Sequence, residues 1–304
     1  MKNKYLFDTD KENVCVMFSG GFDSTLLLIK ALEMKNANLI REVYVTYIDC
    51  DRIACNEKQK EAVNSIMSHL KETISDFKVN NVQIDLSNVR CVWRIQMAQT
   101  MMFLPICLLG IPDNTEIWFG MLDHTTLTNT CSTSVAEEAM NNVVGEIQKH
   151  FSALKNITIK CPIMDYGDCI ESRKAFVVRH LLEYYKIFEL CFSCEDQYPH
   201  EHDCACIKHR ELLTALMGVY EFDYYTLTKK NSYIPGAVSN ECLLRMEHIV
   251  EYMRFHFPGY LSFIQDLANK ISRSIPENTS SPKIPSLGEA LVEKLDINNS
   301  STEE

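Results

Sequence analysis

The sequence lacks any apolar run of about 18 residues, the length that a membrane-spanning helix needs. Its N-terminal stretch, MKNKYLFDTDKENV, is polar and has no apolar segment of the kind found in secretory signals. Basic residues are also scarce, since 30 Lys and Arg stand against 41 Asp and Glu, a formal net charge of −11. Nucleic acids and anionic membranes bind basic patches, so neither is an expected partner. These absences predict a cytoplasmic protein.

The 304 residues do contain enough apolar material for a sizeable core, with 46% hydrophobic residues and no internal repeat. Thirteen cysteines in a reducing compartment indicate core packing, metal ligands or nucleophiles rather than disulfides. We expect a main domain over residues 1–222 and a helical extension over 223–274, with a helix break at Pro258-Gly259. Residues 275–304 are polar and acidic and are expected to form a disordered tail.

Apolar, β-branched segments alternate with segments of helical spacing along much of the main domain. This pattern predicts four strands and three helices: strands at 14–18, 43–48, 82–86 and 116–119, and helices at 24–34, 56–77 and 93–110. Such an order predicts βαβ units and hence an α/β protein of the Rossmann-like kind, with a parallel sheet and helices on both faces. Ligands of these sheets bind at the carboxyl ends of the strands.

The octet FSGGFDST, residues 18–25, follows the first predicted strand and opens the first predicted helix. Backbone N–H groups and the helix dipole favour an anion at such a corner, and Gly20 and Gly21 let the main chain approach a phosphate. The lysine of a GxxxxGK[ST] phosphate loop is missing, because Phe22 and Asp23 follow the glycines. The alternative interpretation is a glycine turn with Asp23 or Ser24 as helix cap.

The stretch SGGFDST resembles the pyrophosphate loop of the adenylating ATP pyrophosphatases. The resemblance implies that the loop holds the β and γ phosphates of ATP, that Mg²⁺ bridges them, and that an acceptor oxygen attacks the α phosphate. Asp23 and Ser24 are the implied catalytic residues, and Asp23 is expected to orient the loop or the metal rather than to act as a base. The implied nucleotide-binding residues are Ser19, Gly20, Gly21, Asp23, Ser24 and Thr25.

Residues 191–209, CFSCEDQYPHEHDCACIKH, hold four cysteines and three histidines. Zinc takes four such ligands in a tetrahedron, and short spacings such as C-x2-C let one turn supply two of them. The pattern predicts a structural zinc site, with a set of buried apolar cysteines as the alternative. The favoured ligands are Cys194, Cys204, Cys206 and His209, and the competing set is Cys191, Cys194, Cys206 and His209.

Together, the loop and the cysteine-rich segment resemble the 7-cyano-7-deazaguanine synthase family of queuosine biosynthesis, over about residues 12–222. Family members carry SGGxDS and, later in the chain, T-x-S-C followed by C-G-x-C-x-x-C-R. Here CFSC at 191–194 and CACIKHR at 204–210 stand in those places. Further likeness lies in three places: Pro162, Ser172-Arg173-Lys174-Ala175, and FGMLD at 119–123.

Enzymes of this family adenylate the carboxylate of 7-carboxy-7-deazaguanine, and ammonia then displaces AMP to give an amide, which a second activation dehydrates to the nitrile. The resemblance implies an ATP-dependent carbon–nitrogen ligase with ATP, Mg²⁺ and Zn²⁺ as cofactors. Candidates to bind a guanine-like edge are Asp123, which we favour, Asp49 and Asp51, with turn or capping roles as the alternative. Trp93 and Trp118 are candidates to stack on a purine, with core packing as the alternative.

Two departures from the family pattern bear on the substrate. CACIKH replaces C-G-x-C-x-x-C, and Gln99-Thr100 replaces an R-N pair. The family also has members in antiphage defence operons, so the resemblance includes a variant in which the activated carboxylate passes to an amine of a partner protein. Two other hypotheses stay open, namely a pyrophosphate-loop enzyme with a different acceptor and a catalytically weak nucleotide-binding scaffold. A homodimer is also an open alternative.

Overall fold

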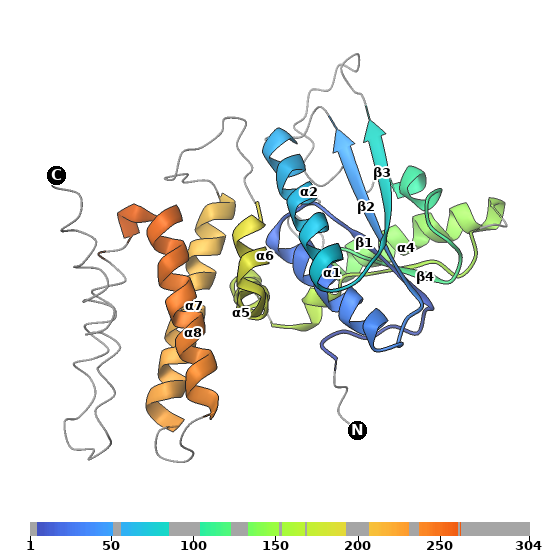
Figure 1. Ribbon diagram of the computed structural model, residues 1–304. Helices are drawn as coiled ribbons and strands as arrows, with labels where there is room; N and C mark the ends of the chain where they lie inside the picture. Colours follow the sequence, from blue (N-terminus) through green and yellow to red (C-terminus); the bar gives the residue numbers. More distant parts are fainter. Residues whose placement is uncertain are drawn as a thin grey trace. The chain divides into compact units, whose positions relative to one another are not determined.

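The computed structural model describes residues 5–50, 56–84, 104–122, 133–151, 154–167, 169–192, 207–230, 237–260 and 262 (Figure 1). The chain divides into two compact units whose boundary falls within one long helix, between Leu216 and Met217. The division into functional regions at residue 222 stays a prediction.

A parallel sheet forms the centre of the first unit. Its strands within the described residues are β1 Asn13–Met17, β2 Glu42–Cys50, β3 Lys78–Ile84, β4 Thr115–Trp118 and β5 Thr158–Lys160. They lie in the order β3-β2-β1-β4-β5, and each pairing is parallel. The α/β fold with a parallel sheet that the alternating pattern predicts is therefore confirmed.

The helices of this unit connect the strands and flank the sheet. They are α1 Phe22–Asn36, α2 Asn56–Thr73, α4 Thr133–His150, α5 Ile170–Leu181, α6 Tyr185–Leu190 and the start of α7 Ile207–Lys230, with 3₁₀ turns η1 Pro162–Asp165 and η2 Leu182–Tyr184. Of the predicted helix at 93–110, residues 104–108 are helical, and residues 93–103 lie outside the described part.

Two strand predictions differ from the structure. The third strand is predicted at 82–86, whereas β3 runs over Lys78–Ile84. It is an edge strand with exposed side chains in its first half, so only its apolar end carries the signal of a buried strand. The sequence pattern also misses β5, because three residues are too few to show a period.

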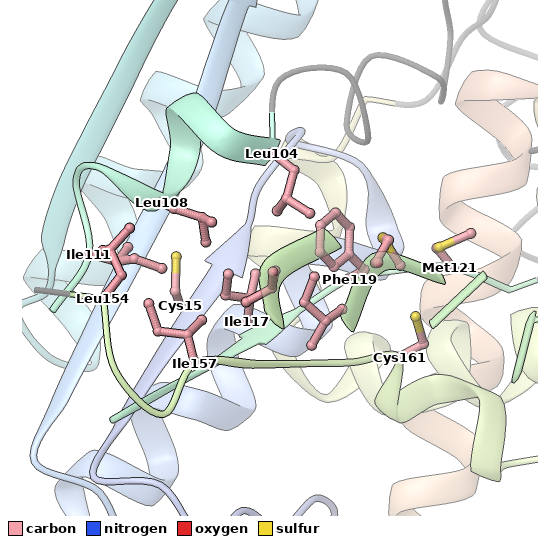
Figure 2. Close-up of a cluster of buried hydrophobic side chains, with 13 residues drawn as sticks. Cys15, Leu104, Leu108, Ile111, Ile117, Phe119, Met121, Leu154, Ile157 and Cys161 are labelled. Carbon is pink, nitrogen blue, oxygen red and sulfur yellow. The ribbon is translucent and has the colours of Figure 1, made fainter. Parts of the chain in front are cut away.

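Helices cover both faces of the sheet. On one face, Cys15 of β1 and Ile117 of β4 pack with Met140 and Val144 of α4 and with Leu108 (Figure 2). On the other face, α1 contacts β1 and β2, and α2 contacts β2. The central strand β1 is buried on both sides, as a parallel strand between two helical layers must be.

The strand order changes direction at β1. From β1 the chain proceeds to β2 on one side, and β4 pairs with β1 on the other. This reversal is the topological switch point, where open α/β sheets bind ligands beyond the carboxyl ends of the strands. FSGGFDST leaves β1 at this point.

The second unit contains the rest of α7 together with α8 Ala237–His256 and the 3₁₀ turn η3 Pro258–Tyr260. A buried ion pair joins its two helices, because Arg245 Nε lies 2.8 Å from Oδ2 of Asp223, which is fully buried. The helix α8 ends just before Pro258-Gly259, and the helix predicted after that break lies outside the described residues. Within the described ranges, no helix has the length and apolar character needed to cross a membrane.

Candidate active site

The turn between β1 and α1 adopts a backbone shape that suits glycine. Gly20 has φ +74°, in the left-handed region, and a Cβ at this residue would lie 3.0 Å from Val63 Cγ2. Gly21 is the N-cap of α1, and no side chain caps the helix there. The first N–H groups of α1 therefore lack both intrahelical and side-chain capping partners, and they follow the carboxyl end of β1.

Hydroxyl groups hold the loop in this shape. The backbone N–H of Ser19 donates to Ser24 Oγ over 3.2 Å, and the two serine hydroxyls are 3.2 Å apart. Ser24 Oγ and Thr25 Oγ1 both donate to the carbonyl of Gly21, over 3.2 Å and 2.7 Å. Ser24 and Thr25 are buried and support the loop from within, while Ser19 is exposed at its rim.

A buried lysine from a distant part of the sequence reaches this loop. Lys174 lies on α5, which packs against α1, and it keeps only 1% of its surface exposed. Its Nζ donates to both carboxylate oxygens of Asp23, over 2.8 Å and 2.9 Å, and lies 5.6 Å from the centre of the Phe22 ring. The cation that the loop lacks in sequence is thus supplied in space by α5.

Lys174 is the main site residue to which sequence reasoning assigned no role. It occurs within the stretch Ser172-Arg173-Lys174-Ala175, which carries part of the family resemblance. That resemblance was the available signal, because a contact across 151 residues leaves no local pattern.

Three other segments close around the loop. The amide of Gln59 in α2 donates to the Ser19 carbonyl over 2.9 Å, and the backbone N–H of Phe192 donates to the Gly20 carbonyl over 2.9 Å. After β4, the chain passes so close to α1 that a Cβ on Gly120 would lie 2.9 Å from the backbone nitrogen of Ser24. The loop is therefore held from α2, from the end of α6 and from β4.

The acids predicted at strand ends have different positions. Asp49 is the penultimate residue of β2 and is buried, and its Oδ2 lies 2.6 Å from Lys60 Nζ of α2. The hydrogen bond and the charge of Asp49 raise the pKa of Lys60. Asp49 therefore joins β2 to α2 in this structure. Asp51 and Asp123 lie outside the described residues.

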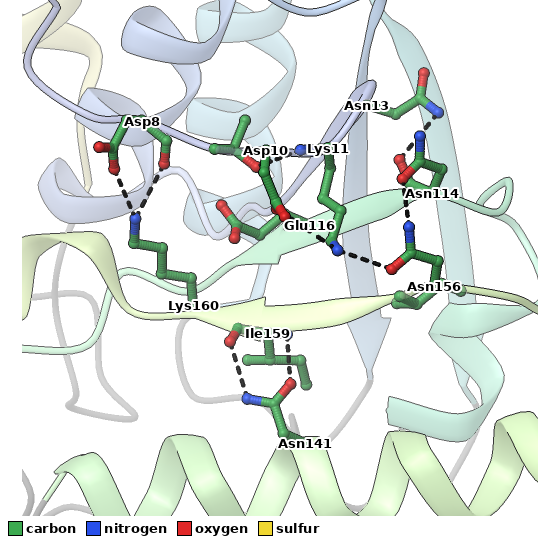
Figure 3. Close-up of polar contacts among 12 residues, drawn as sticks. Asp8, Asp10, Lys11, Asn13, Asn114, Glu116, Asn141, Asn156, Ile159 and Lys160 are labelled. Atoms are coloured by element: carbon green, nitrogen blue, oxygen red, sulfur yellow. Dashed lines mark hydrogen bonds and ion pairs between the residues drawn. The ribbon is translucent and has the colours of Figure 1, made fainter. Parts of the chain in front are cut away.

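Trp118 belongs to the core rather than to a ligand site. Its side chain is fully buried, its Nε1–H donates to Glu116 Oε1 over 2.7 Å, and Phe7 packs edge-on against its ring. The N-terminal segment also reaches β5 here, because Lys160 Nζ donates to Asp8 over 3.0 Å (Figure 3). Trp118 is thus part of the packed interior, and Trp93 lies outside the described residues.

The predicted zinc site falls mostly outside the described residues. His209 is in the first turn of α7 and half-buried, whereas Cys194, Cys204 and Cys206 lie outside the described residues. Cys191 is buried beside the loop, where its Sγ donates to the Ile187 carbonyl over 3.3 Å. Burial raises the pKa of the Cys191 thiol to about 12.

Within the described residues, no group of three His, Cys, Asp or Glu side chains could hold a metal ion. Since three of the four favoured ligands lie elsewhere, the zinc site stays a prediction.

No protein-family model and no curated protein matches this sequence. Membership of the 7-cyano-7-deazaguanine synthase family therefore stays a prediction that depends on the quoted sequence stretches.

Proposed function

We propose that this chain is an ATP-dependent ligase that adenylates the carboxylate of 7-carboxy-7-deazaguanine and releases pyrophosphate. The observation that carries the proposal is the pairing of an uncapped α1 N-terminus, entered through Gly20 at φ +74°, with the buried Lys174 cation at Asp23. Free N–H donors, a helix dipole and a lysine together favour a bound polyphosphate.

The residues at this corner fit a triphosphate. The N–H groups of the first turn of α1 have no side-chain cap, so they can donate to phosphate oxygens. Gly120 packs directly against this turn and fits there because it has no side chain, since a Cβ would lie 2.9 Å from the Ser24 nitrogen. The exposed Ser19 hydroxyl lies at the rim of the loop, within 3.2 Å of Ser24 Oγ.

Each part of the site has a task in adenylation. An oxygen of the acceptor carboxylate forms a bond to the α phosphorus while the bond from that phosphorus to the bridging oxygen breaks. The loop N–H groups and Lys174 stabilise the negative charge that develops on the departing pyrophosphate. Mg²⁺, when bound, neutralises the phosphates, and Asp23 is the loop acid placed to orient it or Lys174.

The second half of the reaction joins carbon to nitrogen. The amine nitrogen attacks the activated carbonyl carbon, the bond from carbon to the AMP oxygen breaks, and an amide forms. The amine is ammonia, on the way to the nitrile, or an amine of a partner protein, as in the antiphage variant. We include Zn²⁺ in the proposal as a structural ion held by Cys194, Cys204, Cys206 and His209, in a segment that starts beside the loop at Phe192.

The test is to incubate the full chain with ATP, Mg²⁺ and 7-carboxy-7-deazaguanine and to quantify AMP and pyrophosphate. We expect both products to depend on the acid, and we expect mass spectrometry to find an amide when ammonia or a partner protein is added. Lys174→Met should abolish the reaction, whereas Lys149→Met, which alters an exposed lysine on α4, should not.

Each other outcome has a distinct meaning. Release of pyrophosphate with a different acid would contradict the acceptor but keep the reaction class. If calorimetry detects no binding of Mg²⁺–ATP, the nucleotide site and with it the whole proposal are wrong.

A further inference from the structure

Arg173 carries a buried positive charge whose hydrogen-bonding capacity is only partly used. It precedes Lys174 on α5 and keeps 8% of its surface exposed. Its Nε donates to the Gly167 carbonyl over 2.9 Å, and its Nη1 donates to the Leu122 carbonyl over 3.0 Å. A guanidinium has five N–H donors, so two are used and three have no partner among the described residues.

The other buried cations of the described residues each have an acid beside them. Lys174 pairs with Asp23, Arg245 with Asp223, and Lys30 with Glu33. No carboxylate of the described residues pairs with Arg173, whose two acceptors are neutral carbonyl groups. Because a buried charge without a counter-ion is costly, this guanidinium is suited to an anion that arrives with a ligand.

Arg173 binds the same chain segment that packs against the nucleotide loop. Leu122, whose carbonyl it binds, follows Gly120 by two residues, a span of at most about 7 Å. Gly120 in turn lies against the first turn of α1. Two consecutive side chains of α5 thus have different partners: Lys174 binds Asp23 of the loop, and Arg173 binds the segment after β4.

We propose that Arg173 binds the carboxylate of the acceptor substrate. The inference rests on the proposed function and adds the residue that selects the acceptor's charge. The bonds to Gly167 and Leu122 fix the plane of the guanidinium, so its remaining donors present a rigid fork. For adenylation, a carboxylate held on this fork must reach the α phosphate of a nucleotide whose outer phosphates are bound at the loop.

The first experiment compares the acid with its neutral isostere. Calorimetry with 7-carboxy-7-deazaguanine and with its 7-carboxamide is run on wild type, Arg173→Gln and Arg173→Lys. We expect Arg173→Gln to weaken binding of the acid by about 30-fold or more while leaving the carboxamide within about twofold. Arg173→Lys should recover part of the loss, because it keeps the charge but not the fork. Mg²⁺–ATP affinity should change little in both variants.

The matched control is Arg179→Gln, which removes a partly exposed arginine from the same helix. It should bind the acid as wild type does. If Arg173→Gln binds the acid as tightly as wild type, the inference is wrong. The inference is equally wrong if Arg173→Gln weakens binding of the acid and binding of the carboxamide to the same extent, since that result indicates a purely structural role.

A second measurement separates this inference from the choice of substrate. If wild type binds no 7-carboxy-7-deazaguanine, the acceptor in the proposed function is wrong, and benzoate and benzamide then serve as the charged and neutral probes. We expect benzoate to raise the Tm of wild type more than benzamide does, and to lose this advantage in Arg173→Gln. An equal response of the two proteins, or no advantage for benzoate in wild type, overturns the carboxylate site.

Discussion

Lys174 Nζ lies 2.8 Å and 2.9 Å from the two carboxylate oxygens of Asp23, across 151 residues of sequence. The lysine side chain is 2% exposed and the aspartate side chain 20%. This ion pair joins α5 to the first turn of α1, so it serves both the stability of the fold and the charge of the candidate nucleotide site.

The ion pair can be tested by a double-mutant cycle. Lys174→Met leaves the Asp23 carboxylate without its buried partner, so we expect it to lower the free energy of unfolding by about 3 kcal/mol. Asp23→Asn combined with Lys174→Met should cost less than the sum of the two single changes, with a coupling of about 1–3 kcal/mol. Urea denaturation of the four proteins measures this term. Additive effects would show that the contact contributes nothing of its own.

The close approach of β4 to the loop predicts a difference between two glycines. Gly120→Ala places a Cβ 2.9 Å from the Ser24 nitrogen and 3.1 Å from Asp23 Cβ, so α1 or the segment after β4 must shift. We expect lower stability and at least about tenfold weaker Mg²⁺–ATP binding, which calorimetry can measure.

The control is Gly145→Ala in the interior of α4, where a Cβ meets nothing within 4 Å. This change should raise stability by about 0.5–1 kcal/mol, because alanine has the higher helix propensity. If Gly120→Ala binds the nucleotide as wild type does, the close packing of Gly120 against the first turn of α1 does not matter for phosphate binding.

Glu116 makes stability depend on pH. Burial is the main cause that raises the pKa of its carboxyl group, while the hydrogen bond from Trp118 and the charge of Lys160 oppose the shift. Above the ordinary glutamate pKa of about 4.3, the folded state keeps this proton longer than the unfolded state. The unfolding free energy therefore falls as pH rises from that value through the raised pKa.

Glu116→Gln keeps an oxygen acceptor for Trp118 Nε1 and removes the charge. We expect it to raise the Tm at pH 7 and to have little effect near pH 4. Glu146→Gln is the control, since Glu146 is exposed and the hydrogen bond from Lys149 lowers its pKa. Tm profiles of wild type and Glu116→Gln that run parallel from pH 4 to pH 7 would rule out this effect.

Thiol reactivity should follow burial. Burial raises the pKa of Cys15 and of Cys107 to about 12, whereas Cys169 is exposed at the start of α5. Since the thiolate is the reactive form, iodoacetamide at pH 8 should label Cys169 first and reach the other two only after denaturation. Peptide mapping by mass spectrometry measures the order in which the three cysteines are labelled. Equal rates for Cys15 and Cys169 in the native protein would be inconsistent with the buried environment described here.

Local patterns predicted the features that depend on neighbouring residues. The apolar run that ends in glycines predicted a strand at residues 14–18 and a helix at 24–34, and β1 Asn13–Met17 and α1 Phe22–Asn36 lie within one or two residues of those bounds. The edge strand β3 was misplaced and the short strand β5 was missed. An exposed or very short strand shows little hydrophobic periodicity in its sequence.

The sequence by itself determined the class of fold and the place of the loop, since the alternation of apolar periods specifies βαβ units and their strand ends. Only the tertiary structure decided which distant groups complete the site. Lys174 at Asp23, Gly120 against Ser24, and the unpaired fork of Arg173 beside Leu122 all depend on how α5 and β4 pack around α1. Packing of this kind is a sum of many weak contacts between residues far apart in the chain, so no short stretch of sequence encodes it.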